Sequence, residues 1–257
     1  MGDDVQSCVG SEVAWCLSLV LRLGAFLVVA CAVTELLRKV LGPATLALID
    51  VPILSYIATH RVAWLTAAMR EITRLGGNGF LLVVVIIAGS VLRRQTGSWR
   101  PLLIIVAMAV GALTIEKVVK LVIARPRPPA GWRIVSESGW SFPSGHATRS
   151  AAVYGGAACL TARFRALGQR AQMILWGLAI ALSLLVGISR IYLGVHWPTD
   201  VVGGWILAVV WLWTVLLTIG SKEKASEKED ILSHEIEGDA EAASRELNRR
   251  ASVDSTR

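Results

Sequence analysis

Two histidines, an aspartate and several basic residues lie in three short polar segments of an otherwise apolar chain. The most informative segment contains His196 and Asp200, four residues apart, with Pro198 between them. Proline is favoured in the first turn of a helix, so Asp200 can reach back to one nitrogen of His196. An imidazole oriented in this way leaves its other nitrogen as a nucleophile or a base. The alternative is a helix-capping arrangement, with Asp200 stabilising a helix N-terminus.

A second polar segment contains Ser144, Gly145 and His146. Serine is a favoured helix N-cap, and glycine allows backbone amides to approach a ligand closely. The free amides at such a helix start form an anion site. The alternative is an ordinary capped helix, with His146 as a polar residue at the membrane interface.

The candidate anion-binding cations are Lys120, Arg127 and Arg190. Arginine presents a planar fork to phosphate oxygens, and lysine presents a compact charge. Pro126 and Pro128 should end the preceding helix before Arg127, which places its side chain in a stiff loop. The alternative is that Lys120 pairs with Glu116, one helical turn earlier, and that the arginines extend to lipid headgroups.

Taken together, these segments favour a catalytic role for their residues over a structural one, because ionisable groups next to membrane helices are costly and usually functional. Several cations around two histidines indicate phosphoryl transfer. The sequence contains no carboxylate cluster suited to Mg²⁺ or Zn²⁺, so we expect neither a metal nor another cofactor.

The composition indicates a membrane protein. Of the 257 residues, 54% are hydrophobic and 18% are charged, and the mean hydropathy is +0.58. These values exclude a disordered chain and argue against a secreted enzyme. A span needs about 20 apolar residues, and its backbone must satisfy its own hydrogen bonds, so the apolar segments should be helices. They cover residues 14–37, 80–92, 102–123, 147–162, 173–188 and 201–219.

The predicted fold is therefore an all-α, six-span membrane bundle. The first segment is interrupted by Arg22 and Glu35, and could instead lie on the membrane surface. Residues 50–75 are predicted to form an amphipathic helix on the membrane or over a site, with a seventh crossing as the alternative. We expect a membrane-embedded domain at 1–220 and a charged, flexible cytoplasmic tail at 221–257.

Charge is distributed unevenly along the chain. Residues 1–220 carry 19 bases and nine acids, a net charge of +10, which indicates anionic headgroups or an anionic substrate. No soluble basic module is left over to bind nucleic acid. The acidic start gives no sign of a signal peptide. The cysteines lack a paired spacing and are interpreted as free thiols: Cys8, Cys16, Cys31 and Cys159.

Basic loops predict the orientation in the plasma membrane. Residues 93–100, 163–170 and 222–224 carry Lys or Arg and share one side of a six-span protein, which should be cytoplasmic. The three polar segments then face the extracytoplasmic side. The opposite loops also hold arginines, which weakens the rule.

The sequence resembles the type 2 phosphatidic acid phosphatase superfamily. Its three signature motifs match Lys120-x6-Arg127-Pro128, Pro143-Ser144-Gly145-His146 and Ser189-Arg190-x5-His196-x3-Asp200. The motifs cover residues 120–200, and the layout of spans extends the resemblance over about 14–220.

The resemblance implies a metal-independent phosphatase that acts on a lipid phosphate in the bilayer. It implies that His196, oriented by Asp200, attacks phosphorus to form a phosphohistidine, and that His146 protonates the leaving oxygen. The groups implied to hold phosphate oxygens are Lys120, Arg127, Ser144, Gly145 and Arg190.

Several alternatives stay open on the sequence. Undecaprenyl diphosphate, phosphatidylglycerol phosphate and phosphatidic acid all fit a basic site that opens to lipid, and the oligomeric state is undefined. A membrane phosphotransferase with an alcohol acceptor would use the same residues. A phospholipid-binding or transport protein would not need His196 and Asp200, and the density of spans argues against a soluble vanadium haloperoxidase of the same superfamily.

Overall fold

The computed structural model describes residues 21, 24–26, 28, 46–165 and 167–217. Most of the predicted span 14–37, three of the cysteines and the tail 221–257 lie outside these residues. The described residues up to Thr214 belong to one compact unit, and of a second unit, Val215–Arg257, only the helical residues up to Leu217 are described. The described part of the chain contains helices and loops but no strand, which confirms the all-α class.

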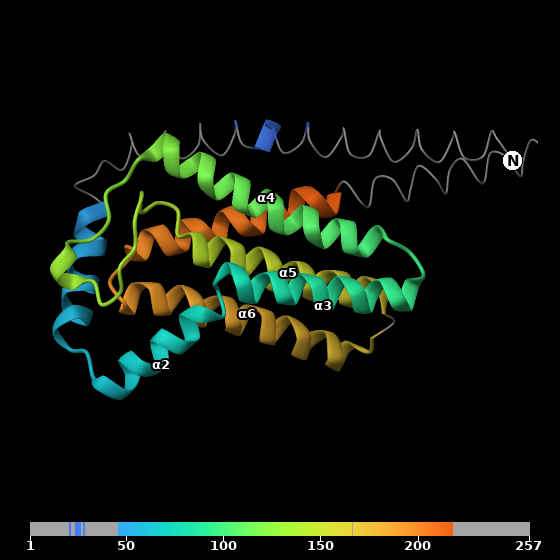
Figure 1. The fold of residues 1–257 in the computed structure, drawn as a ribbon, viewed down its shortest axis with the longest axis horizontal. Helices are drawn as coiled ribbons and strands as arrows, with labels where there is room; N and C mark the ends of the chain where they lie inside the picture. Colours follow the sequence, from blue (N-terminus) through green and yellow to red (C-terminus); the bar gives the residue numbers. More distant parts are fainter. Residues whose placement is uncertain (1–20, 22–23, 27, 29–45, 166, 218–257) are drawn as a thin grey trace, which may run out of the picture. The chain divides into compact units, whose positions relative to one another are not determined.

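Eight helical elements follow one another along residues 46–217 (Figure 1). They are Leu46–Thr59, α2 (Ala63–Arg74), α3 (Asn78–Thr96), α4 (Arg100–Ile123), η1 (Ala130–Trp132), α5 (Gly145–Phe164), α6 (Gln169–Tyr192) and Pro198–Leu217. Among them α3, α4, α6 and Pro198–Leu217 are long and apolar enough to cross a membrane. The protein is therefore a multi-pass membrane protein.

Helix α5, with 20 residues, is similar in length to α3 and Pro198–Leu217, but it is less apolar because its first turns carry His146, Thr148 and Arg149. It packs against α3, α4 and α6, and more than half of its residues are buried. Small residues allow this packing: an added Cβ at Gly156 would lie 2.7 Å from the sulfur of Met108. Its neighbours shield α5 from lipid, so a central helix can carry polar groups.

The single helix predicted for residues 50–75 is instead two helices, Leu46–Thr59 and α2. Arg61, in the break between them, donates hydrogen bonds to the backbone carbonyls of Tyr192 (3.0 Å) and Trp132 (2.7 Å). The amide of Val62 donates to the hydroxyl of Tyr192 at 3.2 Å. These bonds to distant residues hold the chain in a non-helical turn, which hydrophobic periodicity could not reveal.

The arrangement of the helices brings the three polar segments to one end of the bundle. The α3–α4 and α5–α6 connections lie at one end in Figure 1, and the C-termini of α4 and α6 lie at the other. That second end also contains η1 and the N-termini of α5 and Pro198–Leu217. Antiparallel neighbours thus place segments near residues 125, 145 and 196 side by side.

Candidate active site

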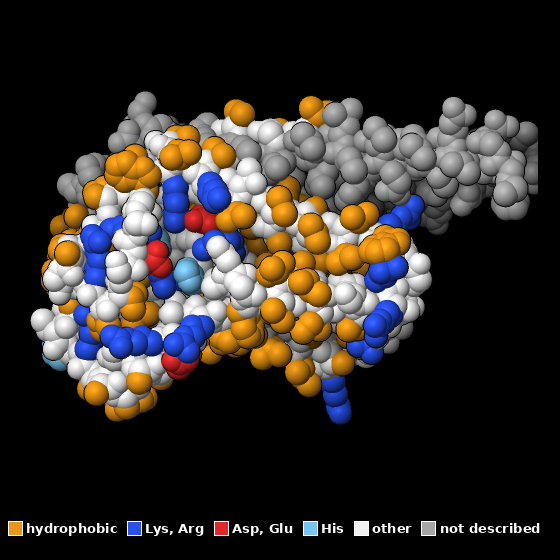
Figure 2. Space-filling view, in the orientation of Figure 1, with side chains coloured by type: hydrophobic (Ala, Val, Ile, Leu, Met, Phe, Trp, Pro, Cys, Tyr) orange, Lys and Arg blue, Asp and Glu red, His pale blue; other side chains and the backbone are white. Residues whose placement is uncertain are grey.

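Basic side chains gather around a hollow at this polar end of the bundle (Figure 2). A histidine and acidic side chains are visible within the ring of cations, whereas apolar side chains cover the middle of the bundle. An anion that reached this hollow would therefore meet a concentrated positive charge at the border of an apolar surface.

His196 is held in the loop between α6 and Pro198–Leu217, and only 2% of its surface is exposed. Its Nδ1 lies 3.5 Å from Oδ2 of the fully buried Asp200. Its Nε2 lies 3.2 Å from Nη1 of Arg127. Because a guanidinium only donates, Nε2 accepts, and the proton of the neutral ring belongs on Nδ1, facing Asp200. The ring thus directs a lone pair toward a cation.

The carboxylate of Asp200 is fixed by three further donors. Arg125 donates to Oδ1 at 2.6 Å, and the amide of Trp197 donates to Oδ2 at 2.9 Å. The hydroxyl of Ser141 also donates to Oδ2. In addition, the backbone carbonyl of Asp200 accepts the amide of Ser144 at 3.0 Å, which ties the second polar segment to the third.

Arg125 also forms an ion pair with a second buried carboxylate, that of Asp50. The distance from Nη2 of Arg125 to Oδ2 of Asp50 is 2.6 Å. Asp50 also accepts the amide and the hydroxyl of Thr199, at 3.0 and 2.6 Å. The sequence analysis assigned no role to Arg125 and missed Asp50. Two features of the sequence could have pointed to this pair: Asp50 is an acid at the edge of an apolar stretch, and Arg125 is a second arginine two residues before Arg127.

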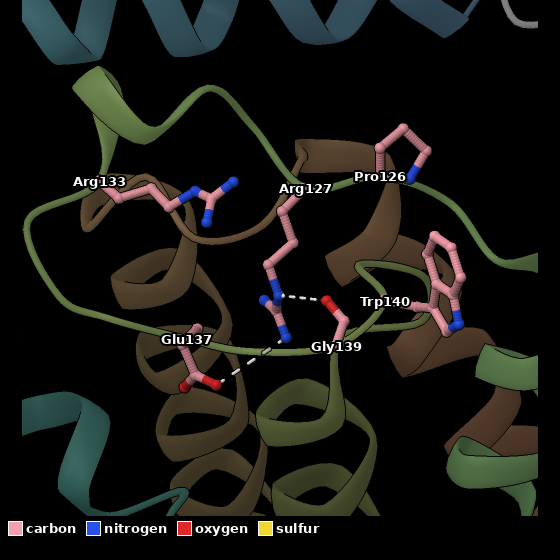
Figure 3. A pocket seen from close by; sticks show the side chains of 6 residues that line it. All are labelled: Pro126, Arg127, Arg133, Glu137, Gly139 and Trp140. Atoms are coloured by element: carbon pink, nitrogen blue, oxygen red, sulfur yellow. Dashed lines mark hydrogen bonds and ion pairs between the residues drawn. The ribbon is translucent and has the colours of Figure 1, made fainter.

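Arg127 and Arg190 converge on one carboxylate, that of Glu137. Figure 3 shows the contact between Arg127 and Glu137. Arg190, 2% exposed, donates to Oε1 of Glu137 and, at 2.9 Å, to Thr73. Nη2 of Arg127 lies 3.8 Å from Oε2 of Glu137. Burial alone would raise the pKa of Glu137, but the charge and hydrogen bond of Arg190 and the charge of Arg127 hold it below its usual value. Two guanidinium groups are thus already arranged around one anion.

Backbone carbonyls lock the guanidinium of Arg127 in place. It donates to the carbonyls of Val195 at 2.8 Å, Gly139 at 2.9 Å and Ser138 at 3.0 Å. Its position next to His196 is therefore set by the loops and does not depend on a ligand. Proline stops α4 as expected: the helix ends at Ile123, and Ala124 adopts a left-handed conformation.

A pocket of about 340 Å³ lies beside Arg127 on the outer side of the site. Figure 3 shows Arg133 and Glu137 on one side of Arg127, and Gly139 and Trp140 on the other. Its lining consists of Pro126, Arg127, Arg133, Glu137, Gly139 and Trp140. The pocket is within the size range of small-ligand sites, and Arg127 and Glu137 both line it.

Lys120 pairs with Glu116 at 2.9 Å, as the structural alternative for this residue predicted. Glu116 also lies 3.4 Å from Nε of Arg149 on α5. An added Cβ at Gly145 would lie 2.4 Å from Oε1 of Glu116, so a larger residue there would displace this carboxylate. His146 lies within electrostatic range of several basic side chains. They are Arg190, Arg149, His196 and Lys120, so cations paired with Glu137 and cations paired with Glu116 both act on it.

Ser144 occupies the N-cap position of α5, but its side chain makes no capping hydrogen bond. Its hydroxyl is buried and has no hydrogen-bond partner among the described residues. A buried hydroxyl without a partner is costly, so this group is available to a ligand at the start of α5. The expected capping role of the side chain is not observed, although the position is the one predicted.

Comparisons with known proteins agree with the three polar segments. The family model that matches residues 100–224 is the PAP2 superfamily. Phosphatidylglycerophosphatase B of Bacillus subtilis is 37% identical over 150 residues, which are 58% of this chain and 73% of that protein. An undecaprenyl-diphosphatase of Sulfolobus acidocaldarius is 36% identical over 101 residues, 37% of this chain and 44% of that protein.

A solved structure is also similar to this chain. It is the crystal structure of a transmembrane PAP2-type phosphatidylglycerolphosphate phosphatase from Bacillus subtilis. The two match with a TM-score of 0.65 and 31% identity, over 79% of this chain and 96% of the other.

The environment of His196 predicts that its ring is neutral well below physiological pH. Burial lowers the pKa of His196 to about 4; the charges of Arg127 and Arg190 act in the same direction, and Asp200 opposes them. The proton should therefore be lost above about pH 4, whereas an unperturbed histidine loses it near pH 6.5. Histidine ¹⁵N NMR in detergent, assigned with His196→Ala, should show a neutral ring at pH 5.5. A midpoint at or above 6.5 would contradict the burial described here.

Proposed function

The chain belongs to the PAP2 superfamily, and on this premise we propose that it is a lipid phosphate phosphatase that works through a phosphohistidine at His196. The observation that carries this proposal is the placement of His196. Its ring is buried, one nitrogen faces Asp200, and the other accepts from Arg127, a cation suited to a phosphate oxygen. A structural histidine needs a hydrogen-bond partner, but it does not need a lone pair directed at a cation that can bind phosphate.

In the first step Nε2 of His196 attacks phosphorus, and the bond from phosphorus to the lipid oxygen breaks. The electron pair of that bond leaves with the oxygen, which takes a proton from His146. The attacking imidazole becomes positively charged, and Asp200 stabilises that charge. In the second step His146 takes a proton from water and the water oxygen attacks phosphorus. The bond from phosphorus to Nε2 breaks, its electron pair returns to His196, and inorganic phosphate is released.

Arg127 and Arg190 are proposed to bind the oxygens of the transferring phosphoryl group. They hold the carboxylate of Glu137 in this structure, and carboxylates and phosphates offer similar acceptors to guanidinium groups. Lys120 has three donors, so it can keep Glu116 and add a bond to phosphate. The buried hydroxyl of Ser144 and the first amides of α5, beginning at Gly145, complete the set.

His146 needs a proton in the first step, although cations surround it. A second positive charge is disfavoured there until a phosphate dianion is bound, because the anion offsets the charge of its neighbours. Substrate binding would therefore supply the conditions under which His146 can act as an acid. No metal is required for either step, because fixed guanidinium and amide donors meet the charge of the transition state.

We further propose that the substrate is phosphatidylglycerol phosphate, undecaprenyl diphosphate or phosphatidic acid. The first two are the substrate classes in the names of the similar proteins. A six-span domain over residues 1–220 and a cytoplasmic tail at 221–257 remain our proposal for the organisation. The basic α3–α4 and α5–α6 connections would be cytoplasmic, and the site would face outside the plasma membrane.

Purified protein should release phosphate from at least one of these three lipids, and an excess of EDTA should leave the rate unchanged, because no step uses a metal. His196→Ala should lower kcat by about 10⁴-fold or more, because removing a nucleophile costs many orders in rate. His60→Ala is the matched control, because His60 is an exposed histidine directly after the helix Leu46–Thr59, and this variant should retain full activity. Loss of turnover in EDTA, or His196→Ala activity within tenfold of wild type, would overturn the proposal.

Cysteine labelling should reveal the orientation in the membrane. Gly131→Cys, in η1, and Gly168→Cys, directly before α6, place thiols at opposite ends of the bundle, where an added Cβ meets nothing within 4 Å. In a chain whose native cysteines are replaced, Gly131→Cys should react with an impermeant reagent on intact cells. Gly168→Cys should react only after lysis. The reverse pattern would refute the orientation and leave the chemistry untouched.

A further inference from the structure

Asp50 is a fully buried carboxylate on the helix Leu46–Thr59, far in sequence from the three polar segments. We propose that Asp50 is a positioning residue for the His196–Asp200 pair and that it acts through Arg125 and Thr199. The inference rests on the proposed function, because it assigns Asp50 a part in activating the same nucleophile. Asp50 itself is not expected to touch the substrate.

The first line of support is the bridge formed by Arg125. Its guanidinium lies between two buried carboxylates, 2.6 Å from Oδ2 of Asp50 and 2.6 Å from Oδ1 of Asp200. It also donates to Thr199 at 2.7 Å. A guanidinium held on both sides cannot rotate away, so Asp50 fixes the direction from which Arg125 approaches Asp200.

The second line of support is the contact with the backbone next to Asp200. Asp50 accepts the amide of Thr199 at 3.0 Å and its hydroxyl at 2.6 Å. Thr199 lies in the first turn of Pro198–Leu217, directly before Asp200. Asp50 thus supplies from another helix the carboxylate that usually caps such an N-terminus. It holds in place the turn that carries Asp200.

The third line of support is the balance of charge. Two buried carboxylates share one guanidinium, so Arg125 does not neutralise Asp200 completely. If Asp50 were neutral, the whole charge of Arg125 would act on Asp200. Asp200 would then stabilise less well the positive imidazole that forms when His196 attacks phosphorus. A buried ion group seldom adds much stability, so a role in the site accounts better for this arrangement.

Asp50→Asn tests the inference, because asparagine keeps the shape of the side chain and can still accept from the amide of Thr199. We expect kcat to fall by about 10–100-fold, as is typical for residues that orient a reacting group without contacting the substrate. KM should change by less than about twofold. Glu71→Gln is the matched control: it removes one acid from an exposed ion pair with Arg74 and should change neither constant. Wild-type kcat in Asp50→Asn, or a raised KM with kcat unchanged, would overturn the inference.

A double-mutant cycle with Arg125→Gln tests the route of the effect. If Asp50 acts through Arg125, adding Asp50→Asn to Arg125→Gln should lower kcat by no more than about threefold, because contacting residues are not additive. Two losses that multiply in full would refute action through Arg125. If Asp50→Asn does not fold, Thr199→Val tests the role of Asp50 in its place. It removes one hydroxyl from the network and should lower kcat with KM unchanged; wild-type kcat would count against the proposal.

A readout that does not depend on turnover separates this inference from the proposed function. The ¹⁵N spectrum of wild-type His196 should show one tautomer, protonated at Nδ1, because Asp200 faces that nitrogen. Asp50→Asn should shift the Nδ1 resonance of His196, because the whole charge of Arg125 would then act on Asp200, and Glu71→Gln should not shift it. A shifted resonance in a protein without phosphatase activity would refute the proposed function and retain the role of Asp50. An unchanged resonance would refute that role.

Discussion

The cost of burying charge is the constraint on which the rest of this structure depends. An ionised side chain loses its hydration in the protein interior, so it is retained there only with a partner of opposite charge. Glu137 lies between Arg127 and Arg190, and Glu116 lies between Lys120 and Arg149. Arg125 joins two buried aspartates. The cations that could receive a phosphate are therefore held in position by carboxylates before any substrate arrives.

This constraint also explains the arrangement of the helices. Charged side chains gather at one end of the bundle, where the ends of α4, α5, α6 and Pro198–Leu217 meet, while the surface between the two ends is apolar (Figures 1 and 2). Helix α5 carries polar residues into the bundle because its neighbours cover it. A site built in this way can receive a charged headgroup from the border of the membrane while the lipid chains stay in an apolar environment.

The parts of the site that depend on local sequence were predictable. The spacing of His196 and Asp200, the prolines around Arg127 and the pairing of Lys120 with Glu116 all follow from helix geometry, and the structure has each of these contacts or boundaries. Four of the predicted spans are apolar helices of sufficient length. Each of these features depends on residues that lie within one or two helical turns of each other, so it can be recognised from the sequence.

The parts that depend on tertiary contacts were not predictable. Asp50 and Arg125 are separated by 75 positions, and Arg190 and Glu137 by 53, so no periodicity links them. The break after Thr59 arises because Arg61 bonds to carbonyls of two distant residues. Ser144 is at the predicted cap position, yet its hydroxyl has no partner in the described part of the chain, because side-chain rotation depends on tertiary surroundings that the sequence does not display.

The central claim is that the phosphoryl group passes through His196, and trapping the intermediate tests this most directly. Protein mixed with a ³²P-labelled lipid phosphate and quenched in alkali within a single turnover should carry label that is stable to base and labile to acid. Peptide mapping should place that label on His196, and the histidine variant should carry none. Label on any other residue, or product formation without labelled protein during the first turnover, would contradict the account.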